Sequence, residues 1–392
     1  MAKPSRDWSL RTRCIHIGNE TDPATGAVIP PIHLASTFRQ HHAGEWREYD
    51  YSRSGNPTRT ALQTTLASIE GGCGALAFGS GMAAIHAVSM LLKAGDHILA
   101  GSDLYGGAYR LFHKICDRAG LTVSLVDLTD LEAVAAARLP QTKLIWGETI
   151  GNPRLSIPDL PALAKFAKDS GILFGVDNTF GSPALIRPLE WGVDIVMHSA
   201  TKYLGGHSDL VGGTLAVADP DLYQRLYFIQ NATGAILDPF SCFLTTRGLK
   251  TLDLRVRAQS QTASELAHWL LAHPRVEQVL YPGLPRHPGH ELAKRLMGGQ
   301  YGGMVTFQIA GDLKQTAKFC ESTELFQLAV SLGAVESLIE QPATMSHASY
   351  GAADRARFGI GDGLIRLSVG LESFEDLRDD LEMAFTAAGL SA

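Results

Sequence analysis

Between residues 75 and 250 the sequence alternates short apolar runs with helical stretches. The apolar runs are ALAF (75–78), HILAGS (97–102), TVSLVD (122–127), KLIWGET (143–149), ILFGVDN (172–178) and DIVMHSA (194–200). Several of them lack a strict alternation of apolar and polar residues, which is typical of strands buried on both faces of a parallel sheet. The pattern therefore predicts an α/β fold, with helices on both sides of a mostly parallel sheet.

The last third of the sequence has a different periodicity. Apolar and polar residues alternate in GGMVTFQIAG (302–311) and again in GLIRLSVGLE (363–372). Such a period of two predicts an antiparallel sheet with one buried face. A final helix is expected after Ser373, which forms a capping box with Asp376.

These patterns divide the chain into three expected parts. Residues 1–55 are proline-dotted and weakly periodic, and they predict an extended arm. Residues 56–250 form the expected α/β domain, and Asn56-Pro57 marks its first helix start. Residues 251–392 form the expected smaller α+β domain.

Composition excludes several classes of protein. The net charge is −6 and no basic tract is present, so we expect no nucleic-acid or membrane partner. The first twenty residues hold no apolar core of a signal peptide, and no apolar window is long enough for a membrane span. The five cysteines are scattered without a Cys-x-x-Cys pair, which favours a cytoplasmic protein without a zinc site.

A glycine-rich turn follows the first expected strand. Gly79-Ser80-Gly81-Met82 lies between this strand and a helix, where exposed amides bind anions such as phosphate. A tight turn that needs glycine only for its geometry explains the segment equally well. The spacing Gly79-x-Gly81-x-x-Ala84, with Asp103 about 20 residues on, also matches a dinucleotide-binding fingerprint.

Two further polar clusters follow expected strands. Asp177 ends one apolar run, where it is either a capping residue or a buried carboxylate that needs a cation or donors. Ser199 and Thr201 flank Ala200, so on an extended chain both hydroxyls face the same way. Lys202 would then face away from these hydroxyls, towards the space between this strand end and Asp177. A solvated surface lysine is the commoner case. It explains neither the apolar run that precedes Lys202 nor the hydroxyls of Ser199 and Thr201 beside it. A desolvated lysine loses its proton more easily and becomes a nucleophile or base.

One ligand accounts for all three clusters. A phosphate suits the glycine turn and the hydroxyls, an aromatic cation suits the carboxylate, and an aldehyde suits the lysine. Pyridoxal 5′-phosphate has these three parts, and its enzymes use a lysine Schiff base and an acid at the pyridinium nitrogen. The dinucleotide hypothesis leaves Lys202 without a role.

The sequence resembles the pyridoxal-phosphate enzymes of cysteine and methionine metabolism, a family that includes cystathionine β-lyase, cystathionine γ-lyase and cystathionine γ-synthase. The resemblance covers residues 10 to 385. It rests on YSRSGNPT, SGMAA, DLYGG, VDNTF, HSATKYLGGHSD, TRGLKTL and LIRLSVGLE, all in family order. It implies fold type I of these enzymes, the aspartate-aminotransferase-like fold.

The resemblance also implies roles for individual residues. Lys202 would carry the cofactor as an aldimine and act as the base, Asp177 would pair with the ring nitrogen, and Tyr105 would stack on the ring and assist proton transfer. The cofactor contacts expected within one chain are Ser80, Gly81, Met82, Tyr105, Asp177, Ser199, Thr201 and Lys202. Tyr51 and Arg53 would reach the phosphate in a neighbouring subunit, so the site needs at least a dimer, and the family usually forms tetramers.

Substrate contacts are implied in the same way. Asn152 and Arg366 would receive the substrate carboxylate, with Ser331 nearby, and Asp50 would contact a distal ammonium group. The family usually has proline just before the pair that corresponds to Asn152-Pro153, whereas this chain has Ile150-Gly151 there. This difference leaves the placement of Asn152 open.

The motifs serve several reactions, and two positions bear on the choice. γ-Synthases and γ-lyases of the family commonly carry glutamate at the position just before Ser331, where this chain has Val330. A methionine γ-lyase would be expected to have cysteine where Gly107 and Ala108 stand. We therefore expect a cystathionine β-lyase that acts through the Lys202 aldimine and a quinonoid.

Five alternatives remain open, and a methionine γ-lyase is one of them. Cystathionine γ-lyase and cystathionine γ-synthase, which joins an O-acyl-homoserine to cysteine, are close to the β-lyase hypothesis. A dinucleotide-dependent oxidoreductase is remote, and so is a silent relative that binds the cofactor without turnover.

Overall fold

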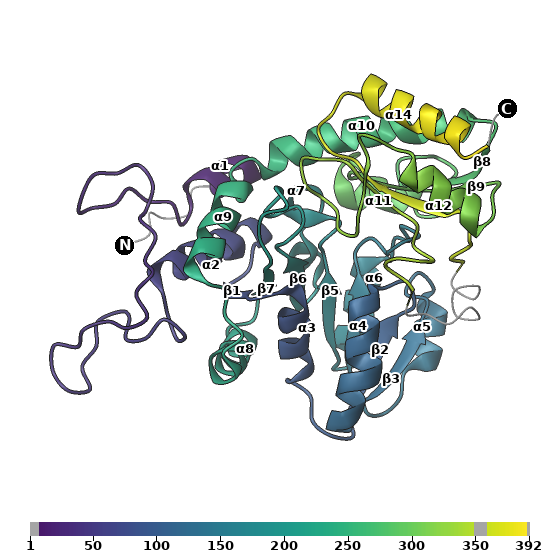
Figure 1. The fold of residues 1–392 in the computed structure, drawn as a ribbon. Helices are drawn as coiled ribbons and strands as arrows, with labels where there is room; N and C mark the ends of the chain where they lie inside the picture. Colours follow the sequence, from purple (N-terminus) through teal and green to yellow (C-terminus); the bar gives the residue numbers. More distant parts are fainter. Residues whose placement is uncertain (1–7, 349–358, 390–392) are drawn as a thin grey trace.

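The computed structural model describes residues 8–348 and 359–389 of the chain (Figure 1). Its first sheet has seven strands in the order β1-β7-β6-β5-β4-β2-β3. Their bounds are β1 Gly74–Phe78, β2 His97–Gly101, β3 Thr122–Val126, β4 Thr142–Glu148, β5 Leu173–Asp177, β6 Ile195–Ser199 and β7 Gly213–Val217. The six strands expected from the apolar runs are therefore present, with ends that shift by at most one residue.

The seventh strand, β7, was not predicted from the sequence. It runs antiparallel to both of its neighbours, β1 and β6. Because of these two pairings, the carboxyl ends of β1 and β6 lie at the same edge of the sheet as those of β4 and β5. β7 approaches the turn after β1 so closely that a Cβ atom at Gly213 would lie 2.2 Å from the carbonyl oxygen of Ser80.

Helices cover both faces of this sheet, as expected. Successive strand residues enter opposite cores: Ala77 and Val176 belong to one, and Phe78 and Met197 belong to the other. The helices that pack into the first core are α2 Pro57–Glu70, α6 Leu160–Asp169, α7 Ser182–Leu185 and α9 Pro239–Leu249. Those that pack into the second core are α3 Gly81–Ser89, α4 Gly106–Arg110, the π-helix η1 Leu111–Cys116 and α8 Pro220–Thr233. The remaining short elements are α5 Leu131–Ala137, η2 Asp117–Ala119 and η3 Pro188–Trp191. The result is a three-layer α/β arrangement.

The second sheet has the order β10-β11-β12-β9-β8. Its strands are β8 Val276–Leu280, β9 Met304–Ile309, β10 Gln327–Leu328, β11 Leu338–Glu340 and β12 Leu364–Ser368. All its pairings are antiparallel except that of β10 with β11. Its helices are α10 Leu252–Ala272, α11 His290–Met297, α12 Leu313–Glu321 and α14 Phe374–Ala387, of which α10, α12 and α14 share its apolar core.

The expectation of one buried face in this sheet was wrong. Thr306 of β9 and Arg366 of β12, on the polar face, are as buried as their apolar neighbours. The hydroxyl of Thr306 donates to the carbonyl of Pro153, 2.7 Å away, in the loop after β4. The polar face is therefore covered by the first domain, and its polar residues lie between the two sheets.

Both ends of the predicted helices follow their sequence signals. The side chain of Asn56 accepts hydrogen bonds from the first amides of α2, and Gly71 ends this helix with φ +76°. The hydroxyl of Ser373 accepts a hydrogen bond from the amide of Asp376 at the start of α14. Only this half of the expected capping box forms, because the Asp376 carboxylate accepts from the Ser373 hydroxyl and not from its backbone amide. These contacts confirm the expected helix starts, while the domain boundaries at 55/56 and 250/251 stay a prediction.

The arm contains one short helix, α1 Leu10–His16, and then lacks regular elements as far as Asn56, apart from isolated bridges (Figure 1, purple). It extends away from the rest of the chain and leaves large apolar side chains exposed: Val28 is 81% exposed, Leu34 73% and Trp46 56%. Among the helices that the structure describes, we find none with the length and apolar character needed to cross a membrane.

Candidate active site

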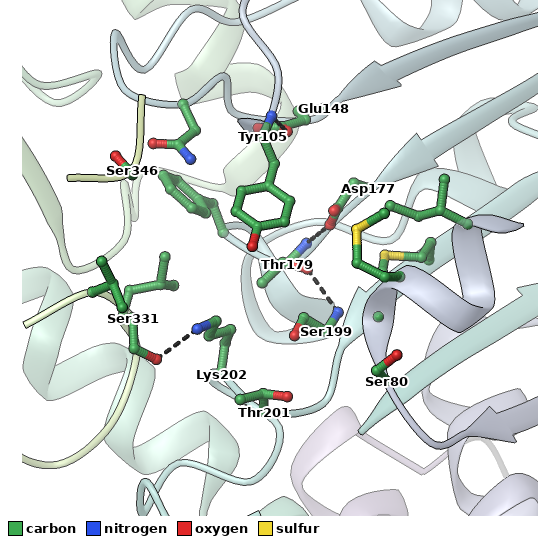
Figure 2. Close-up of a pocket in the computed structure, with 18 of the residues that line it drawn as sticks. Ser80, Tyr105, Glu148, Asp177, Thr179, Ser199, Thr201, Lys202, Ser331 and Ser346 are labelled. Atoms are coloured by element: carbon green, nitrogen blue, oxygen red, sulfur yellow. Dashed lines mark hydrogen bonds between the residues drawn. The ribbon is translucent and has the colours of Figure 1, made fainter. Parts of the chain in front are cut away.

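A cavity of about 440 Å³ lies between the two sheets, at the carboxyl ends of β1, β4, β5 and β6. Side chains from β11 and β12 close it from the second sheet. Of the residues that the sequence assigned to one chain's site, the structure brings all to this cavity: Ser80, Gly81, Met82, Tyr105, Asn152, Asp177, Ser199, Thr201, Lys202, Ser331 and Arg366. Figure 2 shows several of them pointing into the same space.

Lys202 reaches the cavity by a different route from the one expected. The chain does not stay extended after β6: it turns, and the amide of Lys202 donates to the carbonyl of Ser199, 3.1 Å away. Ser199, Thr201 and Lys202 therefore all line the cavity, whereas an extended chain would place the two hydroxyls on the opposite side from Lys202. The Nζ atom of Lys202 donates to the hydroxyl of Ser331 at 2.6 Å (Figure 2).

The amine of Lys202 is less basic than an ordinary lysine. Burial, and to a lesser extent the nearby Arg366 guanidinium, lowers its pKa to about 8, while Glu340 and Asp177 act in the opposite direction. The neutral amine is therefore accessible near neutral pH, which a nucleophile or base requires.

The glycine turn forms the start of α3. The hydroxyl of Ser80 caps this helix by accepting from the amide of Ala83, and the first amides of the helix have no partner within it. A Cβ atom at Gly81 would lie 2.8 Å from Cε of Met197 and 3.2 Å from Cβ of Ser199, so glycine allows this close approach. The arrangement presents backbone donors and a helix N-terminus to the cavity, as an anion site requires.

Thr201 is less available to a ligand than the sequence suggested. Its hydroxyl donates to the carbonyl of Gly212 and accepts from the amide of the same residue. The pair fixes the turn that carries Lys202, so a role in holding phosphate stays a prediction for Thr201.

Asp177 is oriented by a residue that the sequence analysis did not select. The amide of Thr179 donates to Oδ1 of Asp177 at 2.9 Å, and the Thr179 hydroxyl accepts from the amide of Ser199 at 2.8 Å. Figure 2 shows this chain of contacts across the floor of the cavity. Burial raises the pKa of Asp177, while the hydrogen bonds from Thr179 lower it. The carboxylate is thus held in place at the end of β5.

Glu148 ends the neighbouring strand β4, opposite Asp177 in register. Its Oε1 accepts from the backbone amide of Tyr105 at 2.5 Å, which fixes the start of α4. Burial and the nearby Asp177 raise the pKa of Glu148 well above its ordinary value. Ionising two adjacent carboxyl groups in a buried site costs free energy. The raised pKa of Glu148 favours its neutral form.

Arg366 enters from β12 and is 3% exposed. Its Nη1 donates to Oδ1 of Asn152 at 2.9 Å and pairs with Oε1 of Glu340 at 3.0 Å, while Nη2 donates to the carbonyl of Ser331 at 3.0 Å. Its Nε has no hydrogen-bond partner in the described part of the chain. Asn152 therefore lies where the resemblance placed it, despite Ile150-Gly151 in front of it.

Three assigned residues lie outside the cavity of their own chain. Asp50, Tyr51 and Arg53 belong to the arm and are not among its lining residues. Arg53 donates to the carbonyl of Asn231, and Tyr51 is 47% exposed. The roles of Tyr51 and Arg53 in a neighbouring subunit stay predictions, and so does the contact of Asp50 with a distal ammonium group.

Several lining residues were missed by sequence reasoning, namely Arg110, Glu148, Thr179, Glu340 and Ser346. Two of them carried a signal, because Glu148 and Thr179 lie at or just beyond the ends of apolar runs. The others depend on how the elements pack. Asp103, the ribose-binding acid of the dinucleotide hypothesis, accepts from the hydroxyl of Ser156 at 2.6 Å and does not line the cavity.

The residues present fit pyridoxal phosphate. The start of α3 has free amides and no side chain at Gly81, Asp177 is an oriented acceptor, and Lys202 has a pKa of about 8. These features suit the phosphate, the pyridine nitrogen and the aldehyde of that cofactor.

A family model described as "Cys/Met metabolism PLP-dependent enzyme" matches residues 11–386. The chain belongs to this family. It is therefore a PLP-dependent enzyme of cysteine and methionine metabolism, either a lyase or a synthase, and the fold expected for it is confirmed.

Relatives within the Cys/Met metabolism family carry different activities. The cystathionine β-lyase of Coxiella burnetii is 51% identical over 98% of this chain and 99% of that protein. The cystathionine γ-lyase of Dictyostelium discoideum is 48% identical with the same coverage. The structure of cystathionine γ-synthase from Xanthomonas oryzae, in complex with aminoacrylate and cysteine, has a TM-score of 0.95 and 44% identity, and the match covers 99% of this chain and 100% of that one. Overall similarity therefore fixes the family and leaves the reaction open.

The lowered pKa of Lys202 predicts its chemical reactivity. In cofactor-free protein, the rate at which acetic anhydride modifies Lys202 should rise with pH through a midpoint near 8, because only the neutral amine reacts. Mass spectrometry of the digested protein measures this rate, with the exposed Lys314 as an internal standard for the reagent. A midpoint near the ordinary lysine value of about 10.4 would contradict the electrostatics described above.

Proposed function

We propose that this enzyme is a carbon–sulfur lyase that cleaves L-cystathionine to homocysteine, pyruvate and ammonia. The observation that carries the proposal is the shared cavity of Lys202 and Arg366, with Nε of Arg366 buried and unpartnered in the described part of the chain. A buried donor of this kind favours a carboxylate ligand. An amine-reactive lysine beside a carboxylate-binding guanidinium is suited to an α-amino acid.

The two ends of cystathionine have separate places in this proposal. Its reacting amino-acid end lies between Lys202 and Arg366, and its α-carboxylate accepts from Nε of Arg366. Its distal end extends towards the part of the cavity lined by Arg110 and Val330.

When bound, pyridoxal phosphate supplies an electron-accepting ring for the carbon next to the substrate nitrogen. Asp177 then holds a proton at the ring nitrogen, because its oriented carboxylate favours the charged ring. Nζ of Lys202 removes the Cα proton as a neutral amine. The hydroxyl of Tyr105 lies over the same space and assists proton transfer to the leaving sulfur. Arg366 keeps the substrate oriented so that its Cα–H bond faces Lys202.

Val330 supports the choice of β-elimination. It is 61% exposed and lines the cavity just before Ser331, where the γ-type enzymes of the family commonly carry glutamate. An apolar side chain there provides no acceptor for a distal ammonium group. γ-Lyase and γ-synthase activities use the same Lys202 base, and they are the alternative outcomes of the test below.

Product analysis with L-cystathionine tests the proposal. We expect pyruvate and homocysteine by mass spectrometry, and the Lys202→Ala variant should lower the rate by about 10⁴-fold or more because it removes the base. Formation of 2-oxobutyrate and cysteine would instead make the enzyme a γ-lyase. Turnover of an O-acyl-homoserine with cysteine, without cleavage of cystathionine, would make it a γ-synthase.

We also propose that the working enzyme is a homo-oligomer in the cytoplasm. The exposed apolar side chains of the arm need a covering surface, and a second copy of this chain provides one. In a dimer, Asp50, Tyr51 and Arg53 reach the neighbouring cavity, and a tetramer would pair two such dimers. The cytoplasmic location is supported by the five cysteines, all described by the structure and all free thiols.

A mixing experiment tests the shared site. Arg53→Ala and Lys202→Ala should each be inactive alone, but refolding them together should restore roughly a quarter of the activity. Half of the dimers are then hybrids, and each hybrid has one intact site out of two. A mixture that stays inactive while co-purification of differently tagged subunits shows hybrid dimers would contradict the assignment of Arg53 to the neighbouring site.

A further inference from the structure

The cavity contains a buried carboxylate that the proposed reaction does not use. Glu340 is the last residue of β11, and it lies opposite Arg366 in the register of β11 and β12. It is 1% exposed and lines the cavity with Lys202. A glutamate is almost never buried to this extent unless it is paired, so its contacts indicate its purpose.

Oε1 of Glu340 has two partners. It lies 3.0 Å from Nη1 of Arg366, and it accepts from the hydroxyl of Ser346 at 2.6 Å. Oε2 has no hydrogen-bond partner among residues 8–348 and 359–389. Ser346 therefore fixes the carboxylate, and the carboxylate fixes one end of the guanidinium.

These contacts leave one edge of Arg366 for a ligand. Nη1 is held by Glu340 and Asn152, and Nη2 donates to the carbonyl of Ser331. The donors that remain are the buried Nε and the second N–H of Nη2, which lie on the same edge of the guanidinium. Without Glu340 the guanidinium would lose the only opposite charge that pairs with it in the described chain, and it could rotate away from this orientation.

Glu340 also affects the charge around Lys202. The Arg366 guanidinium lowers the pKa of Lys202, and Glu340 and Asp177 raise it. The other titratable groups near Arg366 or Glu340 are Glu148, Tyr203, Cys320 and His347. None of these pairs with Arg366 among the ion pairs of the described residues, so Glu340 is its counter-ion.

We propose that Glu340 is a positioning residue that holds Arg366 with its Nε edge towards the α-carboxylate of the substrate and balances its charge beside Lys202. The inference rests on the proposed amino-acid substrate. It assigns Glu340 and Ser346 to carboxylate recognition, although the substrate contacts neither of them.

Two ligands that differ only by a carboxylate test the proposal in the holoenzyme. The dissociation constants of glycine and methylamine are measured from the absorbance change of the bound cofactor. We expect the wild-type enzyme to bind glycine at least about tenfold more tightly than methylamine, because only glycine contacts Arg366. Glu340→Gln should reduce this preference by at least about fivefold and change methylamine binding by less than about twofold.

The control is Glu291→Gln, which removes the same charge from a side chain that is 85% exposed on α11. It should keep the wild-type preference. A Glu340→Gln enzyme that folds normally by circular dichroism and keeps the full preference for glycine would overturn the inference. Equal binding of both ligands by the wild type would overturn the proposed amino-acid substrate and the inference with it.

A second variant covers the case in which Glu340→Gln does not fold. Ser346→Ala removes the hydroxyl that fixes Glu340 and leaves both charges in place. It should reduce the preference for glycine by about two- to threefold, and an unchanged preference would overturn the inference.

Discussion

The burial of a primary amine at the carboxyl edge of a parallel sheet is the constraint on which this site depends. The amine of Lys202 keeps a pKa of about 8 because protein surrounds it and Arg366 lies nearby. The first sheet supplies Lys202 and Asp177, and the second supplies Arg366 and Glu340. The packing of the two sheets against each other thus creates both the low dielectric and the charge pattern of the cavity.

Much of the fold was predictable because buried parallel strands have a distinct composition. The six apolar runs became β1 to β6, and the capping signals at Asn56 and Ser373 marked real helix starts. Strand β7 was missed because it directly follows an irregular, glycine-rich loop. The burial of the second face of the smaller sheet was also missed. An alternating sequence pattern does not show whether another part of the protein covers the polar face, on which Thr306 lies.

For the site too, features set by local sequence were predictable, and features set by packing were not. Residues that end apolar runs, such as Asp177 and Lys202, could be selected from sequence because parallel strands meet at one edge. Glu340 could not, because its role depends on the register that places it opposite Arg366. Lys202 faces the space beside Asp177 as predicted, but the extended backbone after Ser199 was predicted wrongly, since the chain turns there and Thr201 contacts Gly212.

The central claim is that Lys202 is the residue that bonds to the cofactor. Borohydride reduction of the holoenzyme followed by peptide mapping tests it most directly, because reduction makes the bond between lysine and cofactor permanent. We expect a single phosphopyridoxyl group on the peptide that contains Lys202. A modified lysine elsewhere in the chain, or no modification of a protein that has bound the cofactor, would contradict the account.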